Sequence, residues 1–411
     1  MANPIYADLP TTIFTLMSAL AREHGAINLG QGFPDEPGPR AIRERAAEAV
    51  LEGYNQYPPM PGLPELRQAV ARHYAARQGM DLDWEREVTV TSGATEALAC
   101  AFLALISPGD EVVVFEPAYD AYAPIIRRAG GIPRFVRLTP PDWRFDRSQL
   151  EGAFNERTRL VVLNNPANPT ASIVPPEDLA LLAEFCVRFD AIAICDEVWE
   201  QVMLGGALHT PLIGLPGMRQ RCVKIGSAGK LFALTGWKVG WMCAAPALTE
   251  VLAKAHQFLT FATPPNLQTA VAWGLANSDA WFAAMPADLT RSRDRLAAAL
   301  AAEGFAVLPS HGAYFLNVDL RASGVDMADR DFCLMAVRQA GVAAIPLSAF
   351  YDSAPETGFI RLCFAKADAT LDEGARRMGR ARVIALDRSG ERTIDQPHGP
   401  GRRGAPGGAG A

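Results

Sequence analysis

The sequence has no excess of basic residues and no apolar run long enough to cross a membrane. Lys and Arg together number 39 against 45 Asp and Glu, which gives a formal net charge of −6. A protein that grips nucleic acid by its phosphates usually carries a basic patch and a positive net charge. A membrane-spanning helix needs about 20 consecutive apolar residues, and no run of that length occurs. We therefore expect neither a nucleic-acid partner nor a membrane partner.

The sequence also has no cysteine or histidine pattern of the kind that binds metal. Its seven cysteines are scattered from Cys100 to Cys363, mostly inside apolar runs such as AIAIC, and no Cys-x-x-Cys occurs. Cysteines placed in this way are typical small core residues in a reducing compartment. The apolar run from Ile13 to Ala21 follows Asp8 and no basic segment, which makes it a poor secretory signal. We expect a cytoplasmic protein with no bound metal.

The length and the hydrophobic pattern predict two domains. A chain of 411 residues exceeds what one hydrophobic core usually supports. In its middle part, short apolar runs alternate with longer helical patterns, which indicates βαβ units and a mostly parallel sheet flanked by helices. Beyond Trp281, helical segments surround strand patterns such as GFAVLPSHGAYFLNVDL, which indicates a smaller α+β domain. We predict an α/β fold with these parts: an arm with part of the small domain (1–40), a large domain (41–276), a small domain (277–386), and a disordered tail rich in Gly, Pro and Arg (387–411).

Lys230 is the first candidate for a reactive residue. It lies in CVKIGSAGKLFALTGWKVGW (222–241), where a short apolar run leads into a glycine-rich turn. Apolar flanks leave the side chain little exposed surface, and burial disfavours the ammonium, which frees a lone pair for attack on a carbonyl carbon. This is how lysine forms Schiff bases. Ser227 and Lys238 offer a hydrogen bond and a charge to a phosphate. The alternative, a surface turn with two solvated lysines, is the commoner origin of an isolated Ser-x-x-Lys.

Polar and aromatic side chains follow five predicted strands. Because ligands bind at the carboxyl ends of parallel strands, we expect these side chains to lie together. Each is weak evidence alone, since Asn-Pro is usually a turn and Asp after a strand is often a helix cap. Their convergence favours a site for a phosphorylated ring. The strands at 87–90, 111–115, 160–164, 191–195 and 222–225 are followed by a helix start with Ala94 and Thr95, by Tyr119, by Asn168, by Asp196, and by Ser227 with Lys230.

The segment SAGKLFALTGWKVGW resembles the lysine signature of pyridoxal-phosphate-dependent aminotransferases of fold type I, in the branch that includes kynurenine, glutamine and methionine aminotransferases. The likeness extends from about Leu9 to Leu371, with several separate motifs in the family's order. It implies pyridoxal 5′-phosphate as the cofactor of the large domain, and an amino acid and a 2-oxo acid as substrates. It also implies a homodimer with shared active sites.

The resemblance assigns roles around the cofactor. Lys230 would form the Schiff base and move protons during catalysis. Asp196 would keep the pyridine nitrogen protonated, Asn168 would donate to the ring hydroxyl, and Tyr119 would stack on the ring. Lys238 stands where many relatives have arginine, which keeps the charge and gives up the bidentate fork. The groups implied for the phosphate are the backbone amides of Ala94 and Thr95, the side chains of Ser227 and Lys238, and Tyr57 from the other subunit.

Arg361 is a candidate for binding the substrate carboxylate. It is the one arginine in the apolar strand pattern GFIRLCFAK (358–366), and a buried arginine is costly unless it meets an anion. The alternative is a salt bridge to a carboxylate of the protein. The family pattern Arg-x-x-Phe implies the α-carboxylate of the substrate. The other substrate contacts implied by the resemblance are Gly32 in QGFPD, Asn168, Ile13, Phe33 and, from the partner, Phe261.

This lining predicts the class of substrate. Ile13, Phe33, Tyr119 and Phe261 are large and mostly apolar, and no second arginine is evident for a distal carboxylate. We therefore expect amino acids with large apolar, aromatic, sulfur-containing or glutamine-like side chains rather than aspartate. Two other functions stay open: a β-lyase that cleaves cysteine conjugates on the same scaffold, and a non-catalytic regulatory homologue. Such a regulator normally carries an N-terminal DNA-binding domain, for which the chain has no room before Leu29.

Trp199 is the clearest departure from the family pattern. The segment usually reads Asp-Glu-Val-Tyr, with the tyrosine donating to the ring oxygen, and here it reads Asp196-Glu197-Val198-Trp199. An indole N–H can donate a hydrogen bond but can neither ionise nor accept one. We expect Trp199 to donate to the cofactor, because a buried indole N–H usually finds an acceptor. The alternative is that Trp199 only packs.

Overall fold

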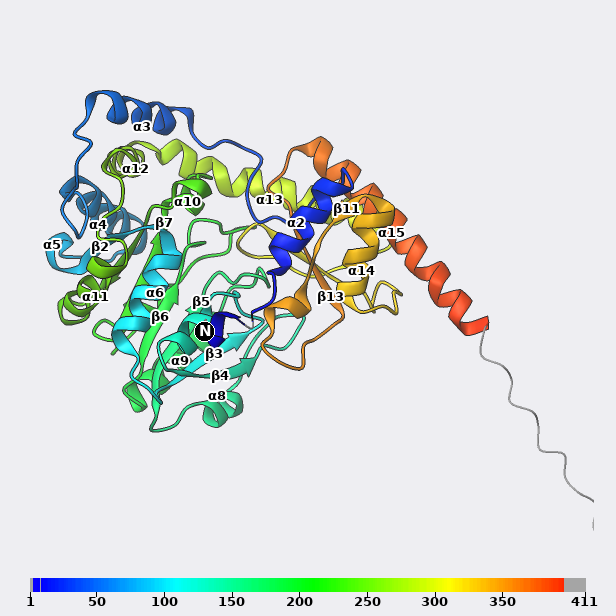
Figure 1. Cartoon of the computed structure of the whole chain (residues 1–411), viewed down its shortest axis with the longest axis horizontal. Helices are drawn as coiled ribbons and strands as arrows, with labels where there is room; N and C mark the ends of the chain where they lie inside the picture. Colours follow the sequence, from blue (N-terminus) through cyan, green and yellow to red (C-terminus); the bar gives the residue numbers. More distant parts are fainter. Residues whose placement is uncertain (1–2, 8, 395–411) are drawn as a thin grey trace, which may run out of the picture.

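The computed structural model of the protein describes residues 3–7 and 9–394, and its elements form a large α/β part and a smaller α+β part (Figure 1). The large part is built on a seven-stranded sheet. Strand β8 runs antiparallel to both of its neighbours, and every other neighbouring pair is parallel. The prediction of a mostly parallel sheet is therefore confirmed. In spatial order the strands are β2 (Val88–Thr91), β8 (Gly240–Ala244), β7 (Cys222–Ser227), β6 (Ile192–Asp196), β5 (Thr158–Asn164), β3 (Glu111–Glu116) and β4 (Ile132–Arg137).

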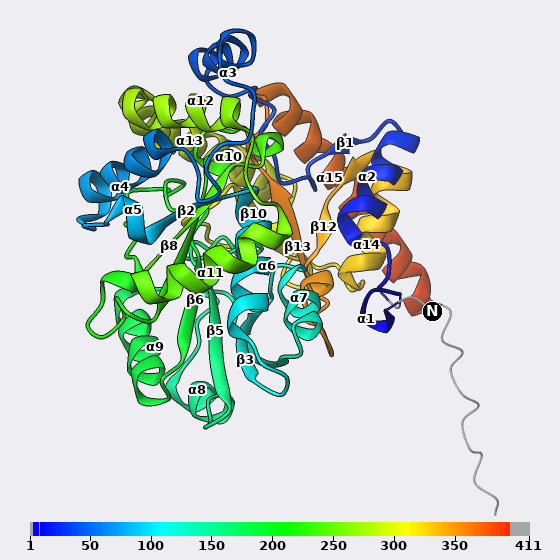
Figure 2. The ribbon, with the colours of Figure 1, turned by 60° about the vertical axis from the view of Figure 1, so that its left-hand side comes forward.

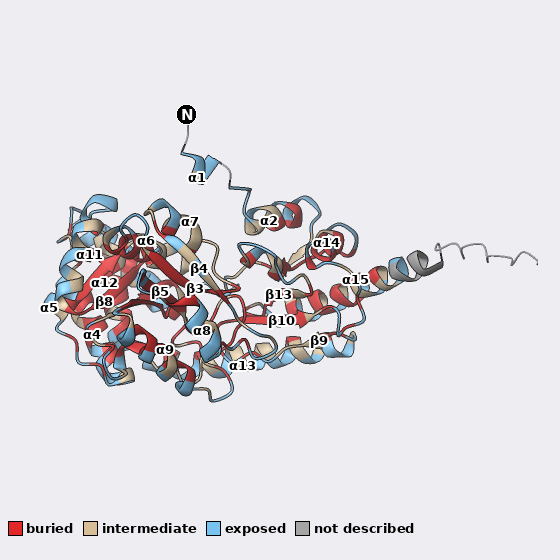
Figure 3. Cartoon of the chain, turned by 90° about the horizontal axis from the view of Figure 1, so that it is seen from below, coloured by how far each residue is buried: buried red, intermediate tan, exposed pale blue. Residues whose placement is uncertain are grey.

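Helices cover both faces of this sheet and form two cores. Successive strand residues point to opposite faces, so Val112 and Val114 join one core while Val113 and Phe115 join the other. The first core contains α6 and α7, and the second contains α4, α8, α9 and α12. Figure 3 shows the strands of this sheet mostly buried, apart from the edge strand β4, with exposed residues on the outer sides of the helices. The helices of this part are α3 (Arg40–Glu52), α4 (Pro64–Gln78), α5 (Trp84–Glu87), α6 (Gly93–Leu105), α7 (Tyr122–Arg128), α8 (Arg147–Ala153), α9 (Pro176–Arg188), η1 (Leu212–Gly214), α10 (Ala228–Leu231), η2 (Thr235–Trp237), α11 (Pro246–Leu259) and α12 (Pro265–Asn277).

The smaller part is formed by both ends of the chain. Its antiparallel sheet has the order β12-β13-β10-β9, and β1 of the N-terminal arm pairs in parallel with β11. The arm therefore packs with this part, and Figure 2 shows α2 beside α14. The elements are α1 (Pro4–Ala7), α2 (Ile13–Glu23), β1 (Ile27–Asn28), α13 (Asp279–Ala302), β9 (Ala306–Val307), β10 (Phe315–Asp319), α14 (Asp329–Met335), the π-helical turn η3 (Ala336–Ala340), β11 (Val342–Ala343), β12 (Ile345–Pro346), η4 (Leu347–Phe350), β13 (Phe359–Cys363) and α15 (Asp368–Ile394).

The C-terminal helix differs from the prediction. A disordered tail was expected from residue 387, yet α15 continues to Ile394. Its first half is anchored in the core by Leu371, Ala375 and Met378, which share one face. Once a helix is formed, each further residue that joins it fixes its backbone and gains one hydrogen bond, so the helix extends easily. The first proline after α15 begins is Pro397, so no proline stops the helix earlier. Residues 395–411 of the predicted tail lie outside the described residues.

Two general features of the chain bear on its class. All seven cysteines are free and buried. In the part of the chain that the structure describes, none of the helices combines the length and the apolar character that crossing a membrane requires.

Candidate active site

Residues from several strand ends meet in one pocket, as the strand-end pattern predicted. The pocket has a volume of about 180 Å³ and lies where α6 and α10 begin, beside the carboxyl ends of β5 and β6. The strand order brings these ends together because β7, β6 and β5 are adjacent. The lining residues are Gly93, Ala94, Thr95, Leu98, Tyr119, Asn164, Asn168, Asp196, Val198, Trp199, Ser227, Gly229, Lys230, Thr235 and Lys238.

Lys230 lies in the short helix α10, directly after β7. Burial, together with the positive charges of Arg361 and Lys238, lowers the pKa of Lys230 to about 8. About one molecule in ten therefore carries a neutral amine at pH 7. Its Nζ donates a hydrogen bond to the hydroxyl of Tyr314 at 3.3 Å and lies 4.6 Å from the ring centroid of Trp199. The amine is thus buried, held in place and readily deprotonated.

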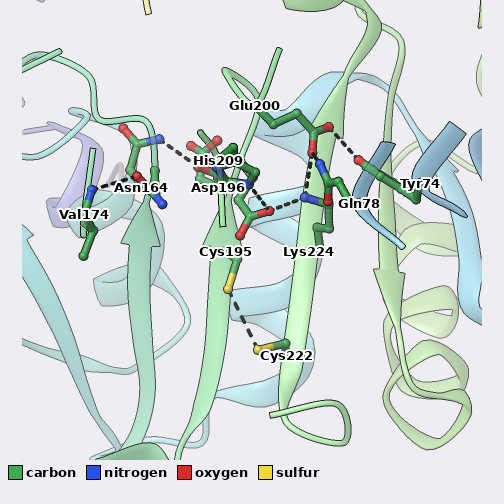
Figure 4. A network of polar contacts seen from close by, with 12 residues as sticks. Tyr74, Gln78, Asn164, Val174, Cys195, Asp196, Glu200, His209, Cys222 and Lys224 are labelled. Carbon is green, nitrogen blue, oxygen red and sulfur yellow. Dashed lines mark hydrogen bonds and ion pairs between the residues drawn. The ribbon is translucent and has the colours of Figure 1, made fainter. Parts of the chain in front are cut away.

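Asp196 ends β6 with one carboxylate oxygen unpaired. The hydroxyl of Tyr122 donates to Oδ2 at 2.6 Å, whereas the buried Oδ1 has no hydrogen-bond partner among the described residues. Asn164 donates to the backbone oxygen of Asp196 at 2.8 Å and fixes the strand end (Figure 4). Burial raises the pKa of Asp196, opposed by Tyr122 and Lys230. A buried acceptor of this kind requires a donor, and the protonated nitrogen of a pyridine ring is one that fits.

The opposite end of the pocket is suited to a phosphate. The first turn of α6 presents backbone N–H groups that have no partner within the helix. Gly93 has φ +76°, and a Cβ there would lie 3.2 Å from Nζ of Lys238. A Cβ on Gly240 would lie 3.0 Å from the backbone nitrogen of Ala94. These two glycines let the ammonium of Lys238 and the start of α6 come close together. The hydroxyls of Ser227 and Thr235 line the same pocket.

Arg361 lies in β13 of the smaller part and is almost fully buried. Its Nη1 donates to Oδ1 of Asn168 at 2.6 Å and its Nη2 to the backbone oxygen of Gly30 at 3.0 Å, while Nε has no partner among the described residues. Its guanidinium carbon lies 4.0 Å from the ring centroid of Phe315. Burial lowers the pKa of Arg361 to about 10, so it stays charged at neutral pH. Within the described residues no salt bridge to a protein carboxylate is found, which removes the structural alternative for this arginine.

Trp199 lines the pocket with its ring buried. The ring stands perpendicular to that of Tyr314, with centroids 4.3 Å apart. Among the described residues, the indole N–H has no hydrogen-bond partner. The side chain therefore faces the site and has a free donor, but its role toward a cofactor stays a prediction.

Six of the predicted substrate or cofactor contacts do not line this pocket: Ile13, Gly32, Phe33, Tyr57, Phe261 and Arg361. Ile13 lines a larger neighbouring cavity of about 690 Å³, which shares Tyr119 with the pocket. Phe33 is half exposed and lies against the amine of Lys366. Tyr57 and Phe261 are exposed by 84% and 39%, with ring centroids 5.5 Å apart. Neither of these two rings lines the pocket of its own chain. Gly32 stays close to the site, because its backbone oxygen accepts a hydrogen bond from Tyr314 at 2.8 Å.

Sequence reasoning missed three residues of the site. Asn164 had a signal, since it ends a predicted strand four residues before Asn168. Tyr122 had a weaker one, three residues after Tyr119. Tyr314 had none, because it contacts Lys230 from a different part of the fold. Its hydroxyl accepts from Lys230 and donates to Gly32, so it links the amine to the loop at residues 29–39.

Known structures share this fold. The structure of YbdL from Escherichia coli, with an identified methionine aminotransferase function, superposes with a TM-score of 0.89 at 41% identity and covers 92% of this chain and 99% of its own. The structure of N-succinyldiaminopimelate aminotransferase from Mycobacterium tuberculosis gives 0.90 at 43% identity and covers 93% and 100%. The fold is therefore the fold type I architecture of aminotransferases, as predicted.

Sequence comparison identifies the family. Residues 24–378 match the model for aminotransferase class I and II. The methionine aminotransferase of Escherichia coli is 43% identical over 371 residues, which cover 90% of this chain and 96% of that protein. Kynurenine–oxoglutarate transaminase 1 of Homo sapiens is 36% identical over 385 residues, covering 86% and 91%. The chain belongs to the class I and II aminotransferases, whose members use pyridoxal phosphate, and it is an aminotransferase.

Proposed function

We propose that this aminotransferase binds pyridoxal 5′-phosphate at Lys230 and transfers an amino group from a large L-amino acid to a 2-oxo acid. The observation that carries the proposal is a set of three buried groups, of which two line the pocket and the third, Arg361, contacts the pocket residue Asn168 from beside it. Lys230 has an amine of lowered pKa, Asp196 has a buried oxygen without a donor, and Arg361 has a buried N–H without an acceptor. A pyridine nitrogen and an α-carboxylate would pair the last two.

When bound, pyridoxal phosphate supplies an aldehyde and a ring that accepts electrons. The residues of the chain would do the rest. Asp196 would hold a proton on the ring nitrogen, and Tyr119 would lie against the ring face. Asn168 lies within hydrogen-bonding reach of Arg361, so it would orient both the ring oxygen and the substrate carboxylate. Lys230 would take a proton from the substrate carbon and return it, because its amine is enclosed and its pKa is lowered to about 8.

The phosphate contacts are proposed on the same basis. Ala94, Thr95, Ser227 and Lys238 line one end of the pocket, and a helix start with a nearby ammonium favours a dianion. Tyr57 would join them from a second copy of the chain. Its exposed position beside Phe261 supports a homodimer in which each subunit completes the other's site, with Phe261 reaching the substrate. The free, buried cysteines support a cytoplasmic location.

The preferred donor should have a large uncharged side chain. No arginine lines the pocket itself, so the distal carboxylate of aspartate would be buried without a partner at a cost of roughly 1–3 kcal/mol. We expect kcat/KM for methionine, phenylalanine, kynurenine or glutamine to exceed that for aspartate by about 10-fold or more. The measurement is a panel of amino acids with pyruvate, 2-oxoglutarate and longer 2-oxo acids.

The panel should include a succinylated diamino acid, because a probable N-succinyldiaminopimelate aminotransferase of Mycobacterium tuberculosis is 44% identical over 379 residues. A preference for aspartate by orders of magnitude would rule out the proposed substrate class. No turnover with any donor, in protein that contains the cofactor, would rule out the proposed reaction.

Trp199 is expected to donate its free indole N–H to the ring oxygen of the cofactor. Trp199→Phe should therefore raise the pKa read from the cofactor absorption spectrum and slow the first half-reaction by roughly 1.5–3 kcal/mol, the worth of one hydrogen bond to a charged group. Trp199→Tyr serves as the control and should stay active, because it restores a donor. The test is a spectral pH titration of all three proteins. An unchanged spectral pKa in the phenylalanine variant would mean that Trp199 only packs.

A further inference from the structure

The turn after β6 directs its side chains to two sides. Asp196 and Trp199 line the pocket, whereas Glu197 and Glu200 are buried away from it and meet Lys224 of β7. Asp196 and Trp199 are three residues apart, as are Glu197 and Glu200, and residues at this spacing lie on the same side of a helical turn. Figure 4 shows Glu200 and Lys224 between Asp196 and helix α4. The same short turn therefore carries two groups of the site and two carboxylates behind it.

Lys224 is fully buried and forms the centre of this second group. Its ammonium contacts Glu197 and donates to Oε2 of Glu200 at 2.6 Å. Burial acts to lower the pKa of Lys224, but the two carboxylates raise it above its ordinary value. Burial likewise disfavours the carboxylate of Glu197, yet Lys224 and His209 hold the pKa of Glu197 below its ordinary value. Lys224 and Glu197 are therefore both charged at neutral pH, in the interior of the protein.

Other side chains also contact the two carboxylates, although the buried Oε1 of Glu197 has no hydrogen-bond partner among the described residues. Tyr74 donates to Oε1 of Glu200 at 2.8 Å and Gln78 to Oε2 at 2.6 Å, both from helix α4. His209 lies 3.0 Å from Oε2 of Glu197. Lys224 is the only lysine or arginine that the structure, within its described residues, pairs with either carboxylate. Without it, the buried carboxyl groups of Glu197 and Glu200 would lie behind Asp196 with no lysine or arginine of the described residues beside them.

We propose that Lys224 is a positioning residue for the reaction at Lys230. Its ammonium holds Glu197 and Glu200 on the far side of the turn, so that Asp196 and Trp199 face the pocket, and it offsets the negative charge beside Asp196. This inference rests on the proposed function, because the orientation of Asp196 matters only if a ring nitrogen binds there. A buried ion pair with one partner removed is strongly destabilising, since the remaining charge has no compensation.

The test compares two ligands that use different ends of the pocket. Pyridoxal phosphate binding is measured by fluorescence quenching, and inorganic phosphate binding by the rise in Tm. Lys224→Met should weaken pyridoxal phosphate at least about 10-fold while phosphate affinity changes by less than about 3-fold, because Asp196 does not contribute to the phosphate end. Equal losses for both ligands, or an unchanged affinity for pyridoxal phosphate, would overturn the proposal.

Glu200→Gln breaks the same ion pair from its other side and is expected to fold, because the amide oxygen can take the place of Oε2 and accept from Lys224 while the amide NH2 can donate to the hydroxyl of Tyr74. Lys224→Met leaves the buried carboxyl groups without their ammonium partner, whereas Glu200→Gln removes one of these carboxyl groups. Glu200→Gln should therefore leave the affinity for pyridoxal phosphate within about 3-fold of the wild type. A loss as large as that of Lys224→Met would mean that the network only packs. These results stay interpretable even if Lys224→Met fails to fold.

Arg134→Met is the matched control. It removes a partner from buried Glu111, where Arg134 donates to Oε2 at 2.7 Å at the amino end of β3, away from the pocket. It should lower Tm without changing the affinity for either ligand. A wild-type protein that binds phosphate but not pyridoxal phosphate would contradict the proposed function. If the wild-type protein binds both pyridoxal phosphate and phosphate, and Lys224→Met binds both with the same affinities, only the inference about Lys224 is contradicted.

Discussion

Replacing Lys230 with alanine is expected to abolish transamination, with kcat falling by at least about 10⁴-fold. The variant loses both the nucleophile that binds the cofactor and the base that moves the substrate proton, and base catalysis alone is worth about 10² to 10⁴. Within the described residues, the pocket holds one other lysine, Lys238, at its phosphate end. Borohydride reduction of the wild-type protein followed by peptide mass analysis should find the cofactor attached at Lys230.

Two variants serve as controls for this result. Lys254→Ala removes an exposed lysine of α11 that pairs with Glu250, and should leave kcat unchanged. Lys238→Ala should weaken cofactor binding and keep turnover when the cofactor is saturating. Full catalytic cycles at the wild-type rate in Lys230→Ala, or trapping of the cofactor on Lys238, would show that the assigned mechanism is wrong.

Replacing Arg361 with methionine is expected to lower kcat/KM for amino acids by about 10²- to 10⁴-fold. The substrate carboxylate would enter a buried site without its charged partner, which costs roughly 3–5 kcal/mol. Arg361→Lys should give an intermediate loss, because it keeps the charge but loses the planar fork. The measurement is steady-state kinetics with the best donor from the substrate panel.

An amino donor that has no carboxylate shows whether Arg361→Met loses a contact to the substrate carboxylate or damages the site itself. With a primary amine of the same side chain, wild type and Arg361→Met should differ by less than about 3-fold, since neither has a carboxylate to bind. An equal loss for the amine and the amino acid would mean that Arg361 supports the structure through Asn168 and Gly30 instead. Arg376→Lys, on the exposed side of α15, controls for the exchange of arginine itself.

The sequence predicted much of the site for a specific physical reason. Strands β5, β6 and β7 are short apolar runs, and adjacent parallel strands bring their carboxyl ends to one edge, so the residues after them were expected to meet. Asn168, Asp196 and Lys230 do line one pocket. The antiparallel strand β8 was not specified in advance, because strand direction depends on how the chain returns to the sheet.

Other parts of the site depend on contacts between distant residues. Tyr314 reaches Lys230 across 84 positions of the chain, and no local pattern indicates such a contact. In the sequence, residues 196–200 form an ordinary acidic segment. Which of their side chains face the pocket and which face the interior depends on the position of Lys224 on the next strand. The length of α15 was also missed, since it depends on how the helix is anchored in the core.

The amino-acid sequence by itself predicted the mostly parallel sheet, the family and the candidate lysine, because hydrophobic period, glycine placement and motif spacing are local properties. The tertiary structure decided which polar groups are left without partners. The free oxygen of Asp196, the free Nε of Arg361 and the enclosed ion pairs of Lys224 each result from burial by segments far apart in the chain. A buried group is paired or unpaired according to its neighbours in space, and these are known only once the chain has folded.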